Sequence, residues 1–467
     1  MPYGFPTISP TVYCRGVLLA AALTTSIGCQ LSVDQIDSDT ATTITASVRD
    51  AASIYPGYLL WHRSDELKQD VDNATILADA SGNVIHVWPS TLTGGGTPAY
   101  LLPDGMLART GTKDIPYARL GPVASVDTLQ IVGKDGNVVW EASARAMGEL
   151  YFHHDFEPLP NGNILVTTYR AIPAAEALAL GWDPLGAEQV WTDGVFEIKP
   201  DLATGGASVI WSWEVVDHLI QDKFPDRSNY GVVADHPDRI DPNFPTNYAP
   251  RNTVRQHINS VDYNAELGQI LISSFIYNEI WIVDRNTTRR QARGERGGLL
   301  YRYGNPAAYD HGSADSRVFL KQHDANWIDP GLPGAGNVLV HNNNTELQLR
   351  RPNDGIVDES PVLNNKGSSE VVELSLPLSA DGTYDRDADA PYAADTVWRW
   401  QSPEYFADFQ GGARRLPNGS TLLTDTTDHL VVELTTDSSI SVTYSSDAPV
   451  YKAFKYSRAE VAPLIDD

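Results

Sequence analysis

The sequence has almost no cysteine and few basic residues. Cys14 and Cys29 are its two cysteines, so nothing beyond residue 29 can form a disulfide with another downstream cysteine. An exported protein of this kind depends on burial and sheet pairing for its stability. Its 34 Lys and Arg stand against 60 Asp and Glu, which gives a formal net charge of −26. A chain this acidic repels nucleic acids and anionic membrane surfaces, which argues against both as partners.

Long apolar runs are also missing, apart from one near the N-terminus. Arg15 precedes the apolar residues 16–27, and Gly28 and Cys29 end the run. Because this run is too short for a permanent membrane helix, it predicts a signal peptide over residues 1–29 and export to the periplasm or outer membrane. The residues before Cys29 form an imperfect lipoprotein cleavage box, which leaves membrane attachment through a lipid on Cys29 open. Residues 30–52, rich in Ser, Thr and Asp, predict a flexible tether.

The remainder of the chain, residues 53–467, alternates short β-type runs with turns that carry Asn-Gly, Asp-Gly or Pro. These dipeptides are typical of tight hairpins because they tolerate positive φ at low cost. Many units end in an aromatic strand, such as VIWSWEV or VWRWQSP. The units begin near residues 57, 98, 152, 256, 322 and 408.

Six units of about four strands each predict an all-β fold, a six-bladed β-propeller with a site on its axis and a C-terminal tail. A β-sandwich is the alternative, but a sandwich does not need the same turn and aromatic strand six times. Residues 174–180 are expected to form a short helix in an insertion.

Three hairpins share one layout, in which a histidine precedes a β-type run, a turn and a second β-type run. Their sequences are HHDFEPLPNGNILVTTY, HINSVDYNAELGQILISSF and QHDANWIDPGLPGAGNVLVHNNN. Equivalent positions in a ring of repeats lie at equivalent radii, so the three histidines are expected to meet on the axis. They are His154 (or its neighbour His153), His257 and His323, with Asp324 and the amides of Asn259, Asn326 and Gln322 nearby.

Two chemistries suit three histidines in a dry pocket. They are able to bind a transition metal together with water or a carboxylate. Alternatively, one imidazole attacks an electrophile while the others stabilise the negative charge of the transferred group. The absence of a G-x-S-x-G elbow and of a P-loop argues against a serine nucleophile at such an elbow and against nucleotide binding.

The same motifs, together with EIWIVDR, LLYRYGNP and GGARRLPNGSTLL, resemble bacterial arylsulfate sulfotransferases of the propeller type. This resemblance implies cofactor-free transfer of a sulfuryl group from a phenolic sulfate ester to a phenol through a sulfated histidine. His323 would be the nucleophile. His154, His257 and Asn259 would bind and polarise the sulfuryl oxygens, and His153, Gln322 and Asp324 are further candidates for substrate binding. Small aryl sulfates and phenols would be the partners, and no metal is implied. A metal-dependent enzyme and a non-catalytic ligand-binding propeller are the alternatives.

The sequence departs from this family at one position that bears on activity. Phe275 stands where well-studied members have an arginine, and phenylalanine cannot replace a bidentate anion clamp. The anion would then rely on imidazoles alone, unless Arg255, Arg302 or Arg414 supplies a charge from another direction. The body has no cysteine to form the family's disulfide, and the chain before the first blade is expected to be too short for the family's extra N-terminal β-domain.

Overall fold

The computed structural model describes residues 44–466 except 64–73, 114–121, 123, 149, 246–253, 345–367 and 404. The predicted signal peptide (residues 1–29), with Cys29 and its lipid, and the predicted tether up to residue 43 lie outside the described residues. Within the described ranges, no helix is long and apolar enough to cross a bilayer.

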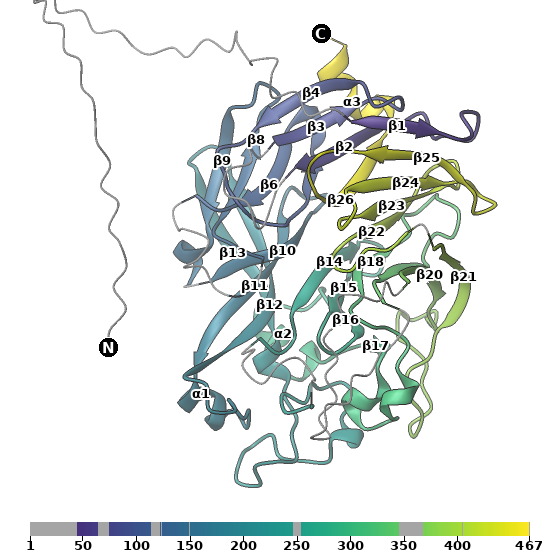
Figure 1. Cartoon of the computed structure of the whole chain (residues 1–467). Coiled ribbons are helices and arrows are strands. Elements are labelled where there is room, and N and C mark those ends of the chain that lie inside the picture. Colours follow the sequence, from purple (N-terminus) through teal and green to yellow (C-terminus); the bar gives the residue numbers. More distant parts are fainter. Residues whose placement is uncertain are drawn as a thin grey trace, which may run out of the picture. The chain divides into compact units, whose positions relative to one another are not determined.

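The described strands form six antiparallel sheets, which are the blades of a six-bladed β-propeller (Figure 1). The predicted fold is therefore confirmed. In blades 1 to 3 the strands, from the inner edge outward, are as follows. Blade 1 has β26 (Val450–Tyr456), β2 (Tyr58–Arg63), β3 (Ala74–Ala78) and β4 (Val84–Pro89); blade 2 has β5 (Ala99–Leu101), β6 (Leu107–Gly111), β8 (Thr128–Val132) and β9 (Val138–Ser143); blade 3 has β10 (Tyr151–Pro158), β11 (Ile164–Pro173), β12 (Gln189–Asp201) and β13 (Gly206–Glu214). The two-residue strand β7 (Ser125–Val126) pairs with the other edge of β10.

Blades 4 to 6 repeat this arrangement, and the helices lie in the connections. Blade 4 has β14 (Ile258–Asn264), β15 (Gln269–Ser274), β16 (Glu279–Asp284) and β17 (Tyr301–Tyr303); blade 5 has β18 (His323–Trp327), β19 (Val338–Asn342), β20 (Glu370–Ser375) and β21 (Asp395–Gln401); blade 6 has β22 (Gly412–Arg415), β23 (Thr421–Asp425), β24 (Leu430–Leu434), β25 (Ile440–Ser445) and β1 (Thr45–Val48). The α-helices are α1 (Ala174–Ala179), which confirms the predicted helix, α2 (Arg289–Ala292) and α3 (Arg458–Ile465).

Both ends of the described chain close the ring. Strand β1 is the outermost strand of blade 6, where Thr45 pairs with Ser445. Strand β26 is the innermost strand of blade 1 and pairs with β2. Figure 1 shows β1 lying beside β25, although the two are far apart in sequence. One expectation is corrected: residues 45–48 belong to a blade and not to the tether predicted over residues 30–52.

The hydrophobic core lies between the blades. Each cluster of buried apolar side chains joins two neighbouring sheets; one, for example, packs Trp211 of blade 3 with Ile270 and Trp281 of blade 4. The aromatic outer strands add polar bonds at five interfaces, because a ring N–H or hydroxyl donates to the next blade. The donor and acceptor pairs are Trp140 with the Gly206 carbonyl, Trp213 with Gly297, Tyr301 with Ala393, Trp400 with Ser438, and Tyr444 with Ala80, at 2.7 to 3.1 Å.

Candidate active site

Bulges in the inner strands shape the axial site. The pairing of β10 with β11 shifts between Phe152 and Phe156, and the other two histidine hairpins shift at corresponding places. His154 lies inside the first bulge with φ of 47°. A bulge leaves one residue out of the ladder and re-aims its side chain. The bulges therefore turn polar side chains of three consecutive blades toward the axis.

Bonds between inner strands show which residues are equivalent. In blades 3, 4 and 5, one side chain of the inner strand accepts a backbone N–H of the next inner strand. The acceptors are Asp155 (from Val261, 2.9 Å), Ser260 (from Ala325, 3.0 Å) and Asp324 (from Ala413, 3.1 Å). The residues just before them therefore occupy equivalent positions in blades 3, 4 and 5. They are His154, Asn259 and His323. His154 and His323 occupy equivalent positions, as predicted. His257 does not, because it lies two residues before the equivalent position of blade 4, which Asn259 occupies.

A small cavity of about 20 Å³ marks the point where these residues meet. A space of this size accommodates about one water-sized group. His154, Asn259, His323 and Asp324, all predicted from sequence, line it. The other lining residues are Gly96, Pro98, Gln410, Gly411, Tyr451 and Lys452.

Hydrogen bonds set the tautomer of His323. Its Nδ1 lies 2.7 Å from Oδ1 of Asn343 and 3.0 Å from the carbonyl oxygen of Lys321. The Asn343 amide nitrogen donates to the carbonyls of Ala407 and Gln410, which fixes its oxygen toward His323. Both neighbours of Nδ1 are therefore acceptors, so Nδ1 carries the proton. The lone pair of the neutral ring is then on Nε2.

Burial keeps this ring neutral. It lowers the pKa of His323 to about 4, even though the bonds to Asn343 and Lys321 act in the opposite direction. Burial, together with the nearby His323, lowers the pKa of His257 to about 3, and the pKa of His154 also lies well below its usual value. An imidazole in an apolar interior loses the solvation of its charged form. At neutral pH the site therefore holds uncharged imidazoles.

The remaining histidines form a chain of rings beside the cavity. His154 Nε2 lies 3.0 Å from His257 Nε2, and His154 Nδ1 lies 2.9 Å from His153 Nδ1. His153 stacks on Tyr169 with ring centroids 3.6 Å apart, and its Nε2 is 3.5 Å from Asp193. His153 does not line the cavity, so His154 is the member of the pair that faces it. His257 contacts the site through His154.

The two predicted amides have different surroundings. Gln322 donates through its side-chain nitrogen to Ser273 Oγ and to the Ser274 and Glu279 carbonyls, so it joins two blades and does not line the cavity. Asn259 donates to the Gln322 carbonyl at 2.7 Å. Its Nδ2 has a second hydrogen, and Asn259 lines the cavity, so this amide is placed to donate to a bound group.

Sequence reasoning missed Lys452, the cation that lines the cavity. Its Nζ lies 2.6 Å from Asp155 and 2.7 Å from Asp324, and the side chain is 7% exposed. Burial disfavours the ammonium, but Asp155 and Asp324 outweigh this effect and raise its pKa, so Lys452 is charged. It was missed because it comes from β26, the C-terminal strand that supplies the inner edge of blade 1.

The arginines proposed to replace the family's clamp are engaged elsewhere. Arg302 is buried in an ion pair with Glu279. Arg414 binds Asp324 at 2.9 Å and lies 3.8 Å from Asp262, and neither Arg414 nor Arg255 lines the cavity. Phe275 itself lies at the site. Its ring centroid is 4.8 Å from that of His257 and 5.4 Å from that of His323.

The alternative of a three-histidine metal centre is corrected by this geometry. In the part of the chain that the structure describes, no group of three His, Cys, Asp or Glu side chains is arranged to hold a metal ion. The facing nitrogens of His154 and His257 bind each other, and His323 Nδ1 is engaged by Asn343. The imidazoles therefore do not converge on one empty point.

A comparison with protein families identifies the wider group. Residues 126–447, more than half of the sequence, match the family described as arylsulfotransferase (ASST). The chain belongs to the arylsulfotransferase family. The resemblance to this family seen in the motifs is confirmed. Membership of the family implies small aryl compounds as substrates.

Other comparisons add little to the family assignment. No curated protein sequence matches this arylsulfotransferase-family chain significantly. Similar solved structures include a Bacteroides caccae protein of unknown function (11% identity, covering 86% of this chain and 99% of that one, TM-score 0.44). Another is the periplasmic gluconolactonase of Pseudomonas aeruginosa (13% identity, 86% and 99%, TM-score 0.41). At these scores, neither likeness bears on the function of this chain.

Proposed function

We propose that this protein is an arylsulfate sulfotransferase that transfers a sulfuryl group from a phenolic sulfate ester to a phenolic acceptor through a sulfo-histidine. The observation that carries the proposal is the neutral His323 ring, in which Nδ1–H donates to two acceptors and Nε2 keeps its lone pair beside the axial cavity. A neutral nitrogen nucleophile is able to attack sulfur at neutral pH, and its adduct remains labile.

In the first half-reaction, the Nε2 lone pair of His323 attacks the sulfur atom of the donor. The N–S bond forms as the S–O(aryl) bond breaks, and the phenolate leaves with the electron pair of that bond. In the second half-reaction, the acceptor phenol oxygen attacks sulfur, its proton passes to solvent or a neighbouring imidazole, and the N–S electron pair returns to His323. In-line transfer of this kind depends on donors around the equatorial oxygens.

Three side chains are placed to supply those donors. Asn259 and His154 line the cavity, and a bound sulfuryl group would take the place of the bond between the Nε2 atoms of His154 and His257, so that these rings could donate to it. The Lys452 ammonium lies at the same cavity and supplies the positive charge that Phe275 does not. Donors fixed in a water-poor site stabilise developing charge without reorganisation.

The test is mass spectrometry after brief incubation with 4-nitrophenyl sulfate in the absence of an acceptor. We expect one sulfo adduct on the peptide that contains His323, with one equivalent of 4-nitrophenol released and the adduct discharged by added phenol. His323→Ala should abolish both signals, while His236→Ala, on an exposed turn, should retain them. Circular dichroism checks that each variant is folded. Absence of the adduct and of released nitrophenol would contradict the proposal.

We also propose that the protein is exported, because Arg15 and the apolar residues 16–27 form a signal peptide pattern that ends at Cys29. The intact mass of protein from its native membrane and soluble fractions checks this. An N-terminus at a diacylated Cys29 would establish a lipoprotein, and an unprocessed Met1 would contradict export.

A further inference from the structure

A second cavity lies at the other end of the inner strands. Strands β10, β14 and β18 begin at the histidines and end at a cavity of about 840 Å³. Ligand pockets commonly measure roughly 300–1,000 Å³. Its walls are the ends of these strands with their hairpin turns, and the turn between β5 and β6. None of its lining residues lines the histidine cavity.

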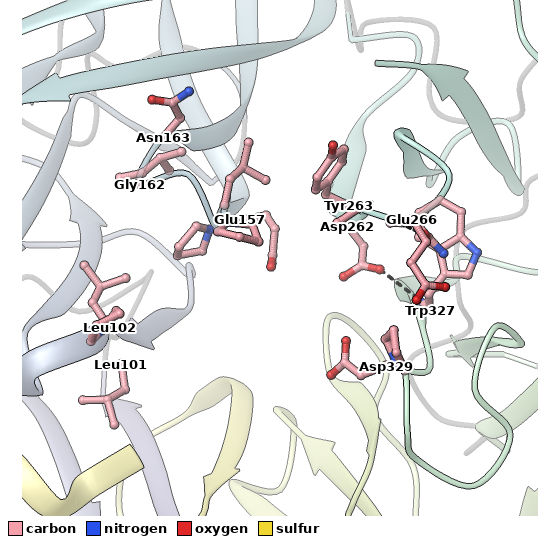
Figure 2. Close-up of a pocket in the computed structure, with 18 of the residues that line it drawn as sticks. Leu101, Leu102, Glu157, Gly162, Asn163, Asp262, Tyr263, Glu266, Trp327 and Asp329 are labelled. Atoms are coloured by element: carbon pink, nitrogen blue, oxygen red, sulfur yellow. Dashed lines mark hydrogen bonds between the residues drawn. The ribbon is translucent and has the colours of Figure 1, made fainter. Parts of the chain in front are cut away.

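The walls are mainly apolar, with two aromatic rings at one side. Leu101 and Leu102 come from blade 2, and Tyr263 and Trp327 come from blades 4 and 5, as Figure 2 shows. Apolar walls of this extent favour a ligand with a ring or chain that leaves water on binding. Aromatic faces also attract cations when these are desolvated.

All the charge on the walls is negative. Glu157 and Asp262 extend into the cavity from facing sides, and Asp329 adds a third carboxylate (Figure 2). Glu266 is the fourth acidic residue of the lining, which contains no Lys, Arg or His among the described residues. Arg414 lies outside the lining, 2.9 Å from Asp324 and 3.8 Å from Asp262, so it offsets part of the charge of one carboxylate. Charge complementarity therefore selects a cation and excludes anionic aryl sulfates.

Electrostatics at the carboxyl pair agree with this selection. Burial, and then the repulsion from Asp262, raise the pKa of Glu157 well above its usual value, and burial raises the pKa of Asp262 to about 6. A cation between the two would stabilise their ionised forms. Its binding is thus expected to release a proton.

We propose that this cavity binds an organic cation, a protonated amine or quaternary ammonium joined to an apolar or aromatic body, at a site separate from His323. The ammonium would lie between Glu157 and Asp262, and the body would pack on Leu101, Tyr263 and Trp327. The site is independent of sulfuryl transfer.

Calorimetry with three biphenyl probes of matched size tests the proposal. 4-Phenylbenzylamine should bind at least tenfold more tightly than 4-phenylbenzyl alcohol, and biphenyl-4-carboxylate should not bind. Repetition in buffers of different ionisation enthalpy should show proton release with the amine. Equal affinity for amine and alcohol, or no binding of the amine, would overturn the proposal.

Variants locate the binding. Glu157→Gln should weaken amine binding at least tenfold, and Glu295→Gln, an exposed carboxylate outside the cavity, should leave it unchanged. His323→Ala should also leave it unchanged, because His323 lines the other cavity. If Glu157→Gln fails to fold, Trp327→Leu gives the second test through the aromatic wall. Amine binding that is lost in His323→Ala and kept in Glu157→Gln would place the amine at the histidine site and overturn the proposal.

Discussion

At the scale of the residue, the site depends on how burial controls the charge of its histidines. Exposed imidazoles would be partly protonated near neutral pH, and a protonated His323 has no lone pair to attack sulfur. Burial keeps the imidazoles neutral, but neutral imidazoles offer no positive charge to the anionic sulfate ester. Lys452 offsets that loss, because two aspartates keep its ammonium charged beside the neutral rings.

The activity should have an acid limb near pH 4. The pKa of His323 is lowered to about 4 from an ordinary value of 6.5, so the ring is neutral above pH 5 and gains a proton as the pH falls through 4. Aryl sulfates remain anionic throughout. We expect kcat/KM to be level between pH 5 and 7 and to fall about tenfold per pH unit below 4. Initial rates with 4-nitrophenyl sulfate and phenol, quenched in alkali, measure this; a limb near 6.5 would contradict a buried neutral nucleophile.

Asn343→Asp should move the acid limb of the pH–rate profile to higher pH. A carboxylate 2.7 Å from Nδ1 would favour the charged imidazolium and raise the pKa of His323. Rates at pH 4 to 5 should then fall relative to the wild type, and rates at pH 7 should change less. A variant that only loosened the fold would lower rates equally at all pH values, so the pH profile separates positioning of His323 from structural damage.

Lys452→Met should lower kcat/KM for 4-nitrophenyl sulfate by roughly 100-fold, the size expected when one preorganised charge-stabilising donor is lost. Lys452→Arg keeps the charge and should retain more activity than Lys452→Met. Both variants disturb the contacts with Asp155 and Asp324, so both should melt at lower temperature. A Lys452→Met variant as active as the wild type would remove Lys452 from the reaction.

Much of this site could be predicted from repeated residues, and the rest could not. His154 and His323 were recognisable because each precedes an aspartate at the start of a hairpin. Asn343 and Lys452 have no such repeat: one lies after the second strand of blade 5, and the other comes from the chain's last strand. His257 contacts the site from outside the shared phase, since a bulge changes which side a residue faces without leaving a clear mark in the sequence.

At the scale of the blade, a glutamate that recurs in the third strand joins neighbouring blades. In three blades this glutamate forms an ion pair with a basic side chain of the following blade. The three residues are Glu197, Glu373 and Glu433. Their partners are Arg285, Arg415 and Lys455. The glutamate stands in the sequence motifs FEI (residues 196–198) and VVEL (residues 371–374 and 431–434), and the aromatic outer strand in VWRWQSP. Their shared role in joining blades needs the three-dimensional order of the sheets. The glycine turns were simpler: Gly162 and Gly419 have φ of 80° and 86°, as Asn-Gly hairpins require.

Lys455→Met should destabilise the fold strongly. Its ammonium is fully buried and binds Glu433, the Tyr444 hydroxyl and the Tyr55 carbonyl. Breaking a buried pair leaves an uncompensated charge and costs about 3–5 kcal/mol. Thermal melting should show a clear fall in Tm.

The exposed pair of Lys223 and Asp183 provides the control, because its removal should cost about 1 kcal/mol or less. The double change Lys455→Met with Glu433→Leu should recover part of the loss, since it removes the unpaired carboxylate. A Tm for Lys455→Met no lower than that for Lys223→Met would contradict the role of this pair.

At the scale of the whole molecule, the ring is closed by two separate strands. Blade 1 takes its inner strand from the C-terminal region, and blade 6 takes its outer strand from the N-terminal region. The first closure also completes the candidate active site, because β26 carries Lys452 and Tyr451 to the cavity. Closure and catalysis are therefore coupled through β26, whereas β1 lies at the outer edge of its blade.

A chain that begins at residue 50 should accordingly lose stability but retain its site chemistry. Removal of β1 uncovers the edge of β25 and deletes Ile44, which is 4% exposed and packs in the cluster between blades 6 and 1. We expect a lower Tm and, because an unpaired edge strand recruits other chains, a tendency to associate. The control is a chain that begins at residue 44. Melting and size-exclusion chromatography compare the two, and kcat/KM below the melting transition should be the same. Equal Tm values would mean that the residues before 50 are dispensable, as a flexible tether over residues 30–52 would require.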